Sequence, residues 1–338
     1  MRSWLSSMLS KPITWLLHIA LATIVVGACV THFFGEQGEI HLRADKAQTV
    51  TIRHSSISLF LWNFEVTESD YITELRLIDR RAKNKEQGLT VEEGVVKMNK
   101  PLKYHGWRFC QSNFDSDMLG VTLKYNYDPW GIGITYTGYA MLLIAMIAFF
   151  FQPHTRFRAL IKKQHKWLMV CLGIAAVVLA FVMTKVVTPK PPLQPVLQTP
   201  LLGIHVSVIM LAYTLFAVIM INGIVGLCSK SKRKKMMQLS QVLLYPALFC
   251  LTAGIFIGAV WANMSWGRYW GWDPKETWAL ITMLVYAALL HFPWLQKYCK
   301  QHTSYIKIYH VCCVIDFIFV LFTYFGVSYL LGGVHSYT

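Results

Sequence analysis

Long hydrophobic runs recur along the chain and are separated by short polar stretches. A helix needs about 20 apolar residues to cross the hydrocarbon core of a bilayer. Seven runs approach or exceed that length and predict seven transmembrane helices, at residues 12–33, 131–152, 167–188, 201–227, 239–262, 277–296 and 308–332. A signal peptide is the alternative for the first run, but it has no clear small-residue cleavage signal. We therefore interpret it as a span.

Between the first two runs the pattern changes to alternating and β-branched residues, which is typical of strands. Residues 49–53, 72–78 and 120–127 are the clearest cases, whereas 88–94 is interpreted as a connecting loop. The predicted fold is thus an all-α polytopic membrane bundle with one small external β-rich domain. Its parts are a first transmembrane helix (1–34), the β-rich domain (35–130), a second helix (131–152), a basic cytoplasmic loop (153–166) and a helical membrane domain (167–338).

Composition and charge agree with a membrane protein. The 338 residues are 55% hydrophobic and only 14% charged, a balance unlike that of a soluble domain. The net charge of +15 does not indicate a nucleic-acid partner, because the basic residues lie in short loops near 2–11, 156–166, 230–235 and 297–307. By the positive-inside rule these loops and the N-terminus are cytoplasmic, and the C-terminus is external.

The cysteines do not predict a redox site. The sequence has eight of them, and they form neither CxxC nor CxxCH. A thiol-disulfide active site, or a haem attached covalently to this chain itself, is therefore not predicted.

The densest chemical signal is the segment 261–278, which holds five of the twelve tryptophans and is placed on the external side. An aromatic belt at the membrane interface is the structural alternative. A belt does not require such clustering, nor Gly267 and Gly271, which allow flat surfaces to approach closely. Grouped indoles suit a flat apolar ligand such as a porphyrin. Arg268 and Lys275 are candidates to pair with its propionates, the alternative being that both are simply solvated.

The acidic end of this segment has two interpretations. Asp273 suits a helix N-cap, Pro274 suits the first helical position and Glu276 completes a capping box. These residues therefore start the helix predicted at 277–296, and a chemical role for Asp273 is the alternative.

Four of the twelve histidines form two pairs by their predicted depth in the membrane. His205, near the external end of its run, and His335, near the C-terminus, lie on the same side as the tryptophan segment. His18 is seven residues from Lys11, and His291 is six residues from Lys297, depths of about 10 Å and 9 Å along a helix. Histidine is the commonest axial ligand of haem iron. Two bis-histidine haem sites, outer and inner, are the hypothesis; ordinary hydrogen-bonding histidines are the alternative.

These residues resemble a known family. The string from Trp266 to Thr282, with segments 322–327 and 333–337, resembles the CcsA half of the system II cytochrome c synthases, members of the WWD haem-handling family. Segments 99–109, 111–115 and 128–129 resemble the ResB (CcsB) partner. The resemblance implies a natural fusion of both halves, in a compact form that lacks two N-terminal spans usual for the family.

The resemblance also implies an activity in a bacterial inner membrane. Haem b would be carried across the membrane and joined by thioether bonds to the CxxCH cysteines of an apocytochrome c at the external face, with thiol-reducing proteins as further partners. Iron would be held by His18, His291, His205 and His335. The remaining haem contacts would come from Trp261, Trp266, Arg268, Tyr269, Trp270, Trp272 and Trp278. The catalytic set would be His205, His335, Trp266, Trp270, Trp272 and Asp273.

Two other functions remain open from the sequence. One is a haem exporter or chaperone without ligase activity. The other is a membrane electron carrier that uses two bis-histidine b-type haems, although such a carrier needs no tryptophan platform. Covalent attachment of haem to an apocytochrome separates the synthase from both.

Overall fold

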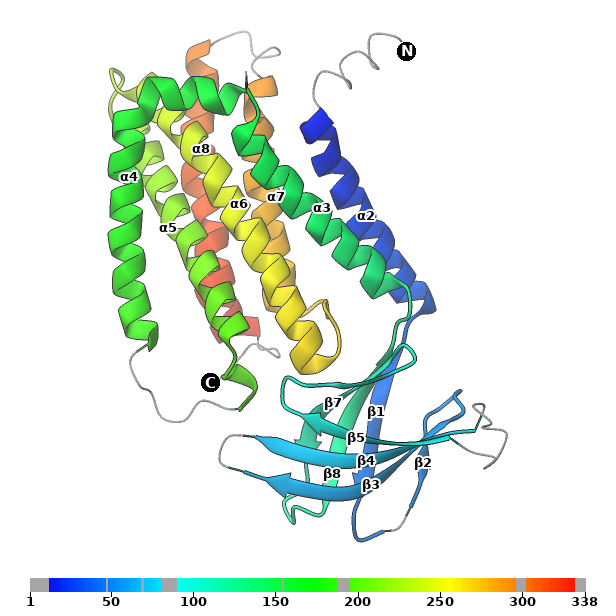
Figure 1. Ribbon diagram of the computed structural model, residues 1–338. Coiled ribbons are helices and arrows are strands. Elements are labelled where there is room, and N and C mark those ends of the chain that lie inside the picture. Colours follow the sequence, from blue (N-terminus) through cyan, green and yellow to red (C-terminus); the bar gives the residue numbers. More distant parts are fainter. Residues whose placement is uncertain are drawn as a thin grey trace, which may run out of the picture. The chain divides into compact units, whose positions relative to one another are not determined.

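The computed structural model describes residues 12–46, 48–67, 70–80, 90–153, 155–187, 195–295 and 302–331. The chain divides into two compact units. The first unit comprises residues 1–142, 190–202 and 259–269, and the second comprises 143–189, 203–258 and 270–338. Each unit is described by itself below, and Figure 1 gives the element labels.

The chain is a polytopic, mainly helical membrane protein. Five helical segments in the described part are long and apolar enough to cross a membrane. They are α2 (Pro12–Phe34), α3 (Gly131–Phe151), α5 (Pro200–Cys228), α6 (Arg233–Trp266) and Tyr305–Leu331, which combines most of α8 (His302–Leu321) with the π-helix η2 (Phe322–Leu331). These five match five of the predicted spans.

Two further helices occupy the other predicted spans. They are α4 (Arg156–Val187) and α7 (Pro274–Leu295), and neither is among the five apolar segments. The number seven therefore stays a prediction. The stretch 153–166, interpreted as a loop, is mostly helical, because α4 begins at Arg156. Lysine and arginine are good helix formers, so a basic run can continue a helix into water.

The β-rich domain consists of two four-stranded antiparallel sheets. One sheet has the order β1-β8-β7-β6 and the other β2-β3-β4-β5. The strands are β1 (Glu36–Arg43), β2 (Val50–Thr51), β3 (Ile57–Val66), β4 (Tyr71–Asp79), β5 (Thr90–Lys97), β6 (Leu102–Tyr104), β7 (Trp107–Phe114) and β8 (Gly120–Tyr127). The strands predicted at 72–78 and 120–127 are confirmed as β4 and β8. The stretch 49–53 contains only the two-residue strand β2. Strand β5 contradicts the predicted loop over 90–94, and residues 88 and 89 of that loop lie outside the described residues.

The core of this domain comes from the alternation of the strands. Side chains on successive residues point to opposite faces of a sheet, and the inward set is almost wholly aliphatic or aromatic, including Leu59, Leu75, Phe109 and Leu123. Thr73 of β4 donates to the amide oxygen of Gln111 of β7 at 2.7 Å inside this core. The bond links the two sheets and satisfies polar groups that would otherwise be costly to bury.

The predicted turn at 128–131 starts α3. The carboxylate of Asp128 accepts a bond from the backbone nitrogen of Gly131 at 2.7 Å and another from the hydroxyl of Thr31 at 2.6 Å. Asp128 thus satisfies the first backbone N–H of α3 and also ties the end of α2 to it.

The second unit is a helical bundle with its own hydrophobic core. Phe216 of α5 stacks on Tyr286 of α7 with ring centroids 3.7 Å apart. At Gly223 of α5 the backbone comes so close to α8 that a β-carbon would lie 3.0 Å from the carbonyl oxygen of His310. A small residue at this position therefore sets how closely the two helices approach, as in many membrane bundles.

Candidate functional site

The tryptophan segment is divided between the two units. Its first part, 261–269, belongs to the first unit, and its second part begins at Trp270 in the second unit. Trp261 and Trp266 are still helical, because α6 continues to Trp266. The tryptophan segment thus consists of a helix end followed by a short connection to α7.

Trp261 does not present a free face in this structure. Only 2% of its surface is exposed, and it packs with Val196 and Ala262. Its ring meets Trp266 edge to face, with centroids 4.8 Å apart and planes at 69°. Its role among the described residues is packing at the end of α6, and haem contact by Trp261 stays a prediction.

The β-rich domain holds the first part of the segment by hydrogen bonds. Arg108 donates to the side-chain oxygen of Asn263 at 2.7 Å, and the Asn126 amide donates to the carbonyl of Gly267, also at 2.7 Å. Tyr269 is buried and donates its hydroxyl proton to Thr31 at 2.8 Å. Contacts from β7, β8 and α2 therefore fix residues 263–269, and sequence reasoning predicted none of these contacts.

Two features favour glycine at position 267: its backbone conformation and the lack of space for a side chain. Its φ angle is +76°, in the left-handed region that favours glycine. A β-carbon there would also lie 2.9 Å from the sulfur of Cys110. Cys110 is buried in β7, and its burial raises the pKa of the thiol to about 12. The thiol is therefore a packing group under the segment, and it stays protonated at neutral pH.

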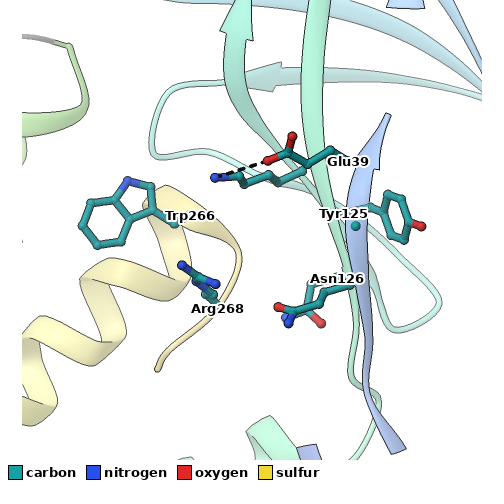
Figure 2. Close-up of a pocket in the computed structure, with 8 residues that line it drawn as sticks. Glu39, Tyr125, Asn126, Trp266 and Arg268 are labelled. Carbon is teal, nitrogen blue, oxygen red and sulfur yellow. Dashed lines mark ion pairs between the residues drawn. The ribbon is translucent and has the colours of Figure 1, made fainter. Parts of the chain in front are cut away.

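Trp266 and Arg268 line a cavity of about 200 Å³ with residues of β1 and β8. Figure 2 shows Glu39 and Asn126 on the strands, facing Trp266 and Arg268, while Tyr125 points to the opposite side. The Lys124 ammonium lies 3.6 Å from the Glu39 carboxylate. The cavity thus combines charges of both signs with one indole wall.

In the second unit, Trp272 is the exposed aromatic surface of the segment. Its side chain is 70% exposed, and its φ angle is +56°. A bulky residue is rarely found in this left-handed conformation, which is kept where the surroundings impose it and is often functional. Trp270 stands perpendicular to it, with ring centroids 5.8 Å apart. Trp270 is partly buried against the helical core, so it packs between this core and Trp272.

The capping box predicted at the start of α7 is present. The Asp273 carboxylate accepts from the backbone nitrogen of Lys275 at 3.2 Å. The Glu276 carboxylate accepts from the backbone nitrogens of Asp273 at 3.3 Å and Gly271 at 2.7 Å. Both carboxylates are therefore used to hold the connection to α7 in place.

Trp278, one turn into α7, packs on the π-helix η2. Its ring centroid is 4.3 Å from that of Phe322. A buried pair of threonine hydroxyls, Thr282 and Thr323, lies 2.9 Å apart beside it, and Lys275 donates to Ser328 at 3.1 Å. π-helices are rare and often occur at functional sites. Sequence reasoning did not predict these contacts. Pairing of Lys275 with a propionate stays a prediction.

His205 lies in α5 and is held by a neighbouring helix. Its Nδ1 donates to the carbonyl of Gly254 in α6 at 2.7 Å. A β-carbon at Gly258 would lie 2.6 Å from the Cε1 atom of the ring. The bond to Gly254 fixes the orientation of the imidazole and the tautomer that can ligate a metal through Nε2. Backbone carbonyls commonly hold metal-ligating histidines in this way.

The other three candidate ligands, His18, His291 and His335, have less structural support than His205. His18 and His291 each donate Nδ1 to the carbonyl four residues earlier, Thr14 and Ala287, both at 2.7 Å. They belong to different units, His18 to the first and His291 to the second. His335 lies outside the described residues. The inner and outer pairs therefore stay predictions.

Comparison with known proteins agrees with the chemistry of this segment. The sequence model of the family described as "Cytochrome C assembly protein" matches residues 133–335, more than half of the chain. Similar proteins include Protein NrfI of Wolinella succinogenes, 40% identical over 156 residues that cover 43% of this chain and 17% of the relative.

Two cytochrome c biogenesis proteins CcsA are also similar. That of Chlamydomonas reinhardtii is 35% identical over 168 residues, 46% of each chain. That of Guillardia theta is 48% identical over 87 residues, 26% of this chain and 27% of the relative. The chain thus spans less than half the length of these curated relatives.

Proposed function

Because the chain belongs to the cytochrome c assembly protein family, we propose that it acts in cytochrome c maturation as a haem lyase. Haem b is its substrate, together with an apocytochrome c that carries a CxxCH motif. Family membership and the names of the relatives, Protein NrfI and the CcsA biogenesis proteins, support this function. The resemblance of segments 99–109, 111–115 and 128–129 to ResB supports the second part of the proposal, a natural fusion of the two synthase halves.

The reaction requires positioning and no net redox change. Each cysteine S–H adds across one vinyl group of haem, so that sulfur bonds to carbon, the proton moves to the other vinyl carbon and nothing is released. Both thiols must be reduced beforehand, which is the reason to propose thiol-reducing proteins as partners. Correct alignment alone can supply several kcal/mol of the barrier, roughly 7–11 in favourable cases.

His205 carries the proposal for the outer site. Its ring is fixed by the Gly254 carbonyl at 2.7 Å and by the close approach of Gly258, which is the support that iron-ligating histidines need. We propose His205 and His335 as the two axial ligands. The exposed face of Trp272, backed by Trp270, would hold the porphyrin plane there.

The other predicted haem contacts are proposed in supporting positions. Trp266 and Arg268 border one cavity of the first unit, and Trp278 lies at the start of α7. Tyr269 and Asp273 are both buried and hydrogen bonded, which favours a positioning role for each. For the inner side we propose His18 and His291 as ligands, because each ring has its Nδ1 bonded to its own helix.

The location follows from the same proposal. The chain would reside in a bacterial inner membrane in contact with lipid, with the N-terminus in the cytoplasm and the tryptophan segment on the external face. The basic residues at 156–166 and 230–235 support this orientation through the positive-inside rule.

Expression with an apocytochrome c in a host that lacks its own maturation system tests the proposal. The expected result is haem that stays on the apocytochrome through a denaturing gel. His205→Ala and His335→Ala should each reduce this covalent product at least about tenfold, and added imidazole should restore part of it by replacing the missing ligand. His165→Ala, an exposed histidine of α4, is the matched control and should have no effect.

The rival functions give different results in this experiment. Purified chain that contains haem but forms no covalent product would indicate an exporter or chaperone. Haem reduced by a quinol, again without covalent product, would indicate an electron carrier. Either result would refute the proposed haem lyase activity.

A further inference from the structure

Strand β1 has one edge without a partner strand in the described part of the chain. It pairs with β8 on one side and ends the sheet order β1-β8-β7-β6. Proteins often protect such edges by keeping the strand short, and the edge strands β2 and β6 have only two and three residues. The other two edge strands, β1 and β5, have eight residues each. Of these two long edges, β1 lines the cavity described above and β5 does not, so β1 is the candidate surface for an added strand.

Only one half of β1 is occupied by side-chain bonds. At its C-terminal end Arg43 binds Asp45, Asp115 and Asp117 at 2.7 to 2.9 Å, and His41 also contacts Asp115. Among the described residues, 36–38 take part in no such side-chain network. Glu39 makes one ion pair, with Lys124 at 3.6 Å. An additional strand is therefore accommodated best along 36–39.

This half of β1 borders the cavity that Trp266 and Arg268 line (Figure 2). Pockets for drug-sized ligands and cofactors are commonly about 300–1,000 Å³, so a cavity of about 200 Å³ takes a single side chain more readily than a porphyrin. Its border carries one negative charge, on Glu39, and two positive charges, on Lys124 and Arg268. An environment of mixed sign suits a polypeptide, since a nucleic acid or an anionic lipid head group would also meet the Glu39 carboxylate.

We propose that the free edge of β1 at 36–39 binds the apocytochrome segment that flanks its CxxCH motif, in extended conformation, with one side chain in the cavity. This inference rests on the proposed function, and it names the surface that receives the protein substrate. Strand addition uses main-chain hydrogen bonds for affinity and pockets for selectivity. It would accept different apocytochromes, and it would hold them beside the segment 266–268, which the same domain fixes through Asn126.

Photo-crosslinking tests the location. Benzoylphenylalanine is placed at position 37 of the full-length chain, and at position 93 of β5 as a control that is also exposed on a strand. The probe is a synthetic apocytochrome peptide with a CxxCH motif whose two cysteines are replaced by serine, so that no haem can be attached. We expect crosslinking at position 37 at least about tenfold above position 93. Equal yields, no yield at 37, or a crosslink to a second copy of the chain would overturn the proposal.

Methylation of the peptide backbone tests the binding mode without changing the protein. Two peptides carry N-methyl groups on alternate residues, one on odd and one on even positions. In a strand only alternate amides point to the neighbouring strand, so one of the two peptides should lose most of its crosslinking and the other should keep it. Full crosslinking by both peptides would contradict strand addition.

Crosslinking and covalent haem attachment, measured on the same chain, test the β1 site and the proposed function separately. Covalent haem attachment without crosslinking at position 37 would refute the β1 site and leave the lyase intact. Crosslinking at position 37 in a chain that never attaches haem would support the β1 site as a peptide surface and refute the lyase.

Discussion

At the scale of single residues, Gly258 controls the position of His205. The β-carbon of alanine at this position would lie 2.6 Å from the imidazole Cε1, so Gly258→Ala must push the ring away. We expect this variant to lose about 10–100-fold in haem affinity, the usual effect of disturbing the support of a metal ligand. Haem retained on the purified chain, measured by absorbance after washing, checks this.

A change of fold would not explain that result. Alanine favours a helix over glycine by about 0.5–1 kcal/mol, which offsets part of the cost of displacing the ring, so Gly258→Ala should still fold and give a cooperative thermal melt. Gly203→Ala in α5 is the matched control, because no atom lies within 4 Å of its added β-carbon. Normal haem retention by Gly258→Ala would refute the role of His205.

Cys110 gives a prediction about pH. Burial raises the pKa of its thiol to about 12, and maleimides react with the thiolate. At pH about 8.5, where an ordinary cysteine is half ionised, Cys110 should stay protonated and unlabelled. In a chain without the other cysteines, the exposed position of Val95→Cys should be labelled within minutes. Labelling of Cys110 at a similar rate would show that it does not pack under Gly267 as described.

Residue patterns predicted local chemistry well and tertiary contacts poorly. The capping box of Asp273 and Glu276 could be foreseen because all of its partners lie within five residues. The bonds from Arg108 and Asn126 to residues 263 and 267 join positions more than 140 residues apart. No spacing rule in a single sequence reports such pairs.

At the scale of elements, the start of α7 separates a structural role of Asp273 from a catalytic one. Asparagine caps a helix as well as aspartate does, whereas alanine costs about 1 kcal/mol. Asp273→Asn should therefore keep nearly full haem attachment, and Asp273→Ala should lower both attachment and thermal stability. The attachment assay and a thermal melt of both variants measure this. Loss of activity in Asp273→Asn with normal stability would indicate that the carboxylate itself takes part in the chemistry.

Hydrophobic patterns predict the ends of helices and strands less accurately than their presence. The apolar run 239–262 predicted a helix that ends before most of the tryptophans, yet α6 continues to Trp266. Its polar residues Asn263 and Ser265 are buried and bonded to Arg108 and Asn99 of the β-rich domain. Likewise, the sequence of 88–94 predicts a connecting loop, yet residues 90–94 belong to β5. Pairing with β4 along its whole length overrides that local signal.

At the scale of the whole molecule, the orientation in the membrane can be tested by labelling from outside. In a variant without native cysteines, Glu93→Cys in the β-rich domain should react with a membrane-impermeant maleimide in intact cells. Lys163→Cys in the basic start of α4 should react only after the membrane is permeabilised. Both side chains are exposed, so access to the reagent depends on the side of the membrane. The reverse pattern would contradict the positive-inside assignment.

The overall organisation was foreseen in part. Hydropathy identified the helices, and the change in composition at 35–130 identified the β-rich domain, because both depend on local patterns. The division of the tryptophan segment between two compact units at 269 and 270 was not foreseen. The division depends on which distant residues contact each part of the segment. A single sequence does not show these contacts, so the segment looks like one continuous motif.

The most direct test of the central claim is a single turnover with purified components. The chain, loaded with reduced haem, is mixed with a reduced peptide that contains CxxCH, and the peptide is analysed by mass spectrometry after denaturation. The expected product has the mass of the peptide plus one haem, with no atoms lost, and it is absent when His205→Ala replaces the native chain or when both cysteines are serine. A peptide of unchanged mass, with haem still bound to the chain, would contradict the claim that this protein joins haem to cytochrome c.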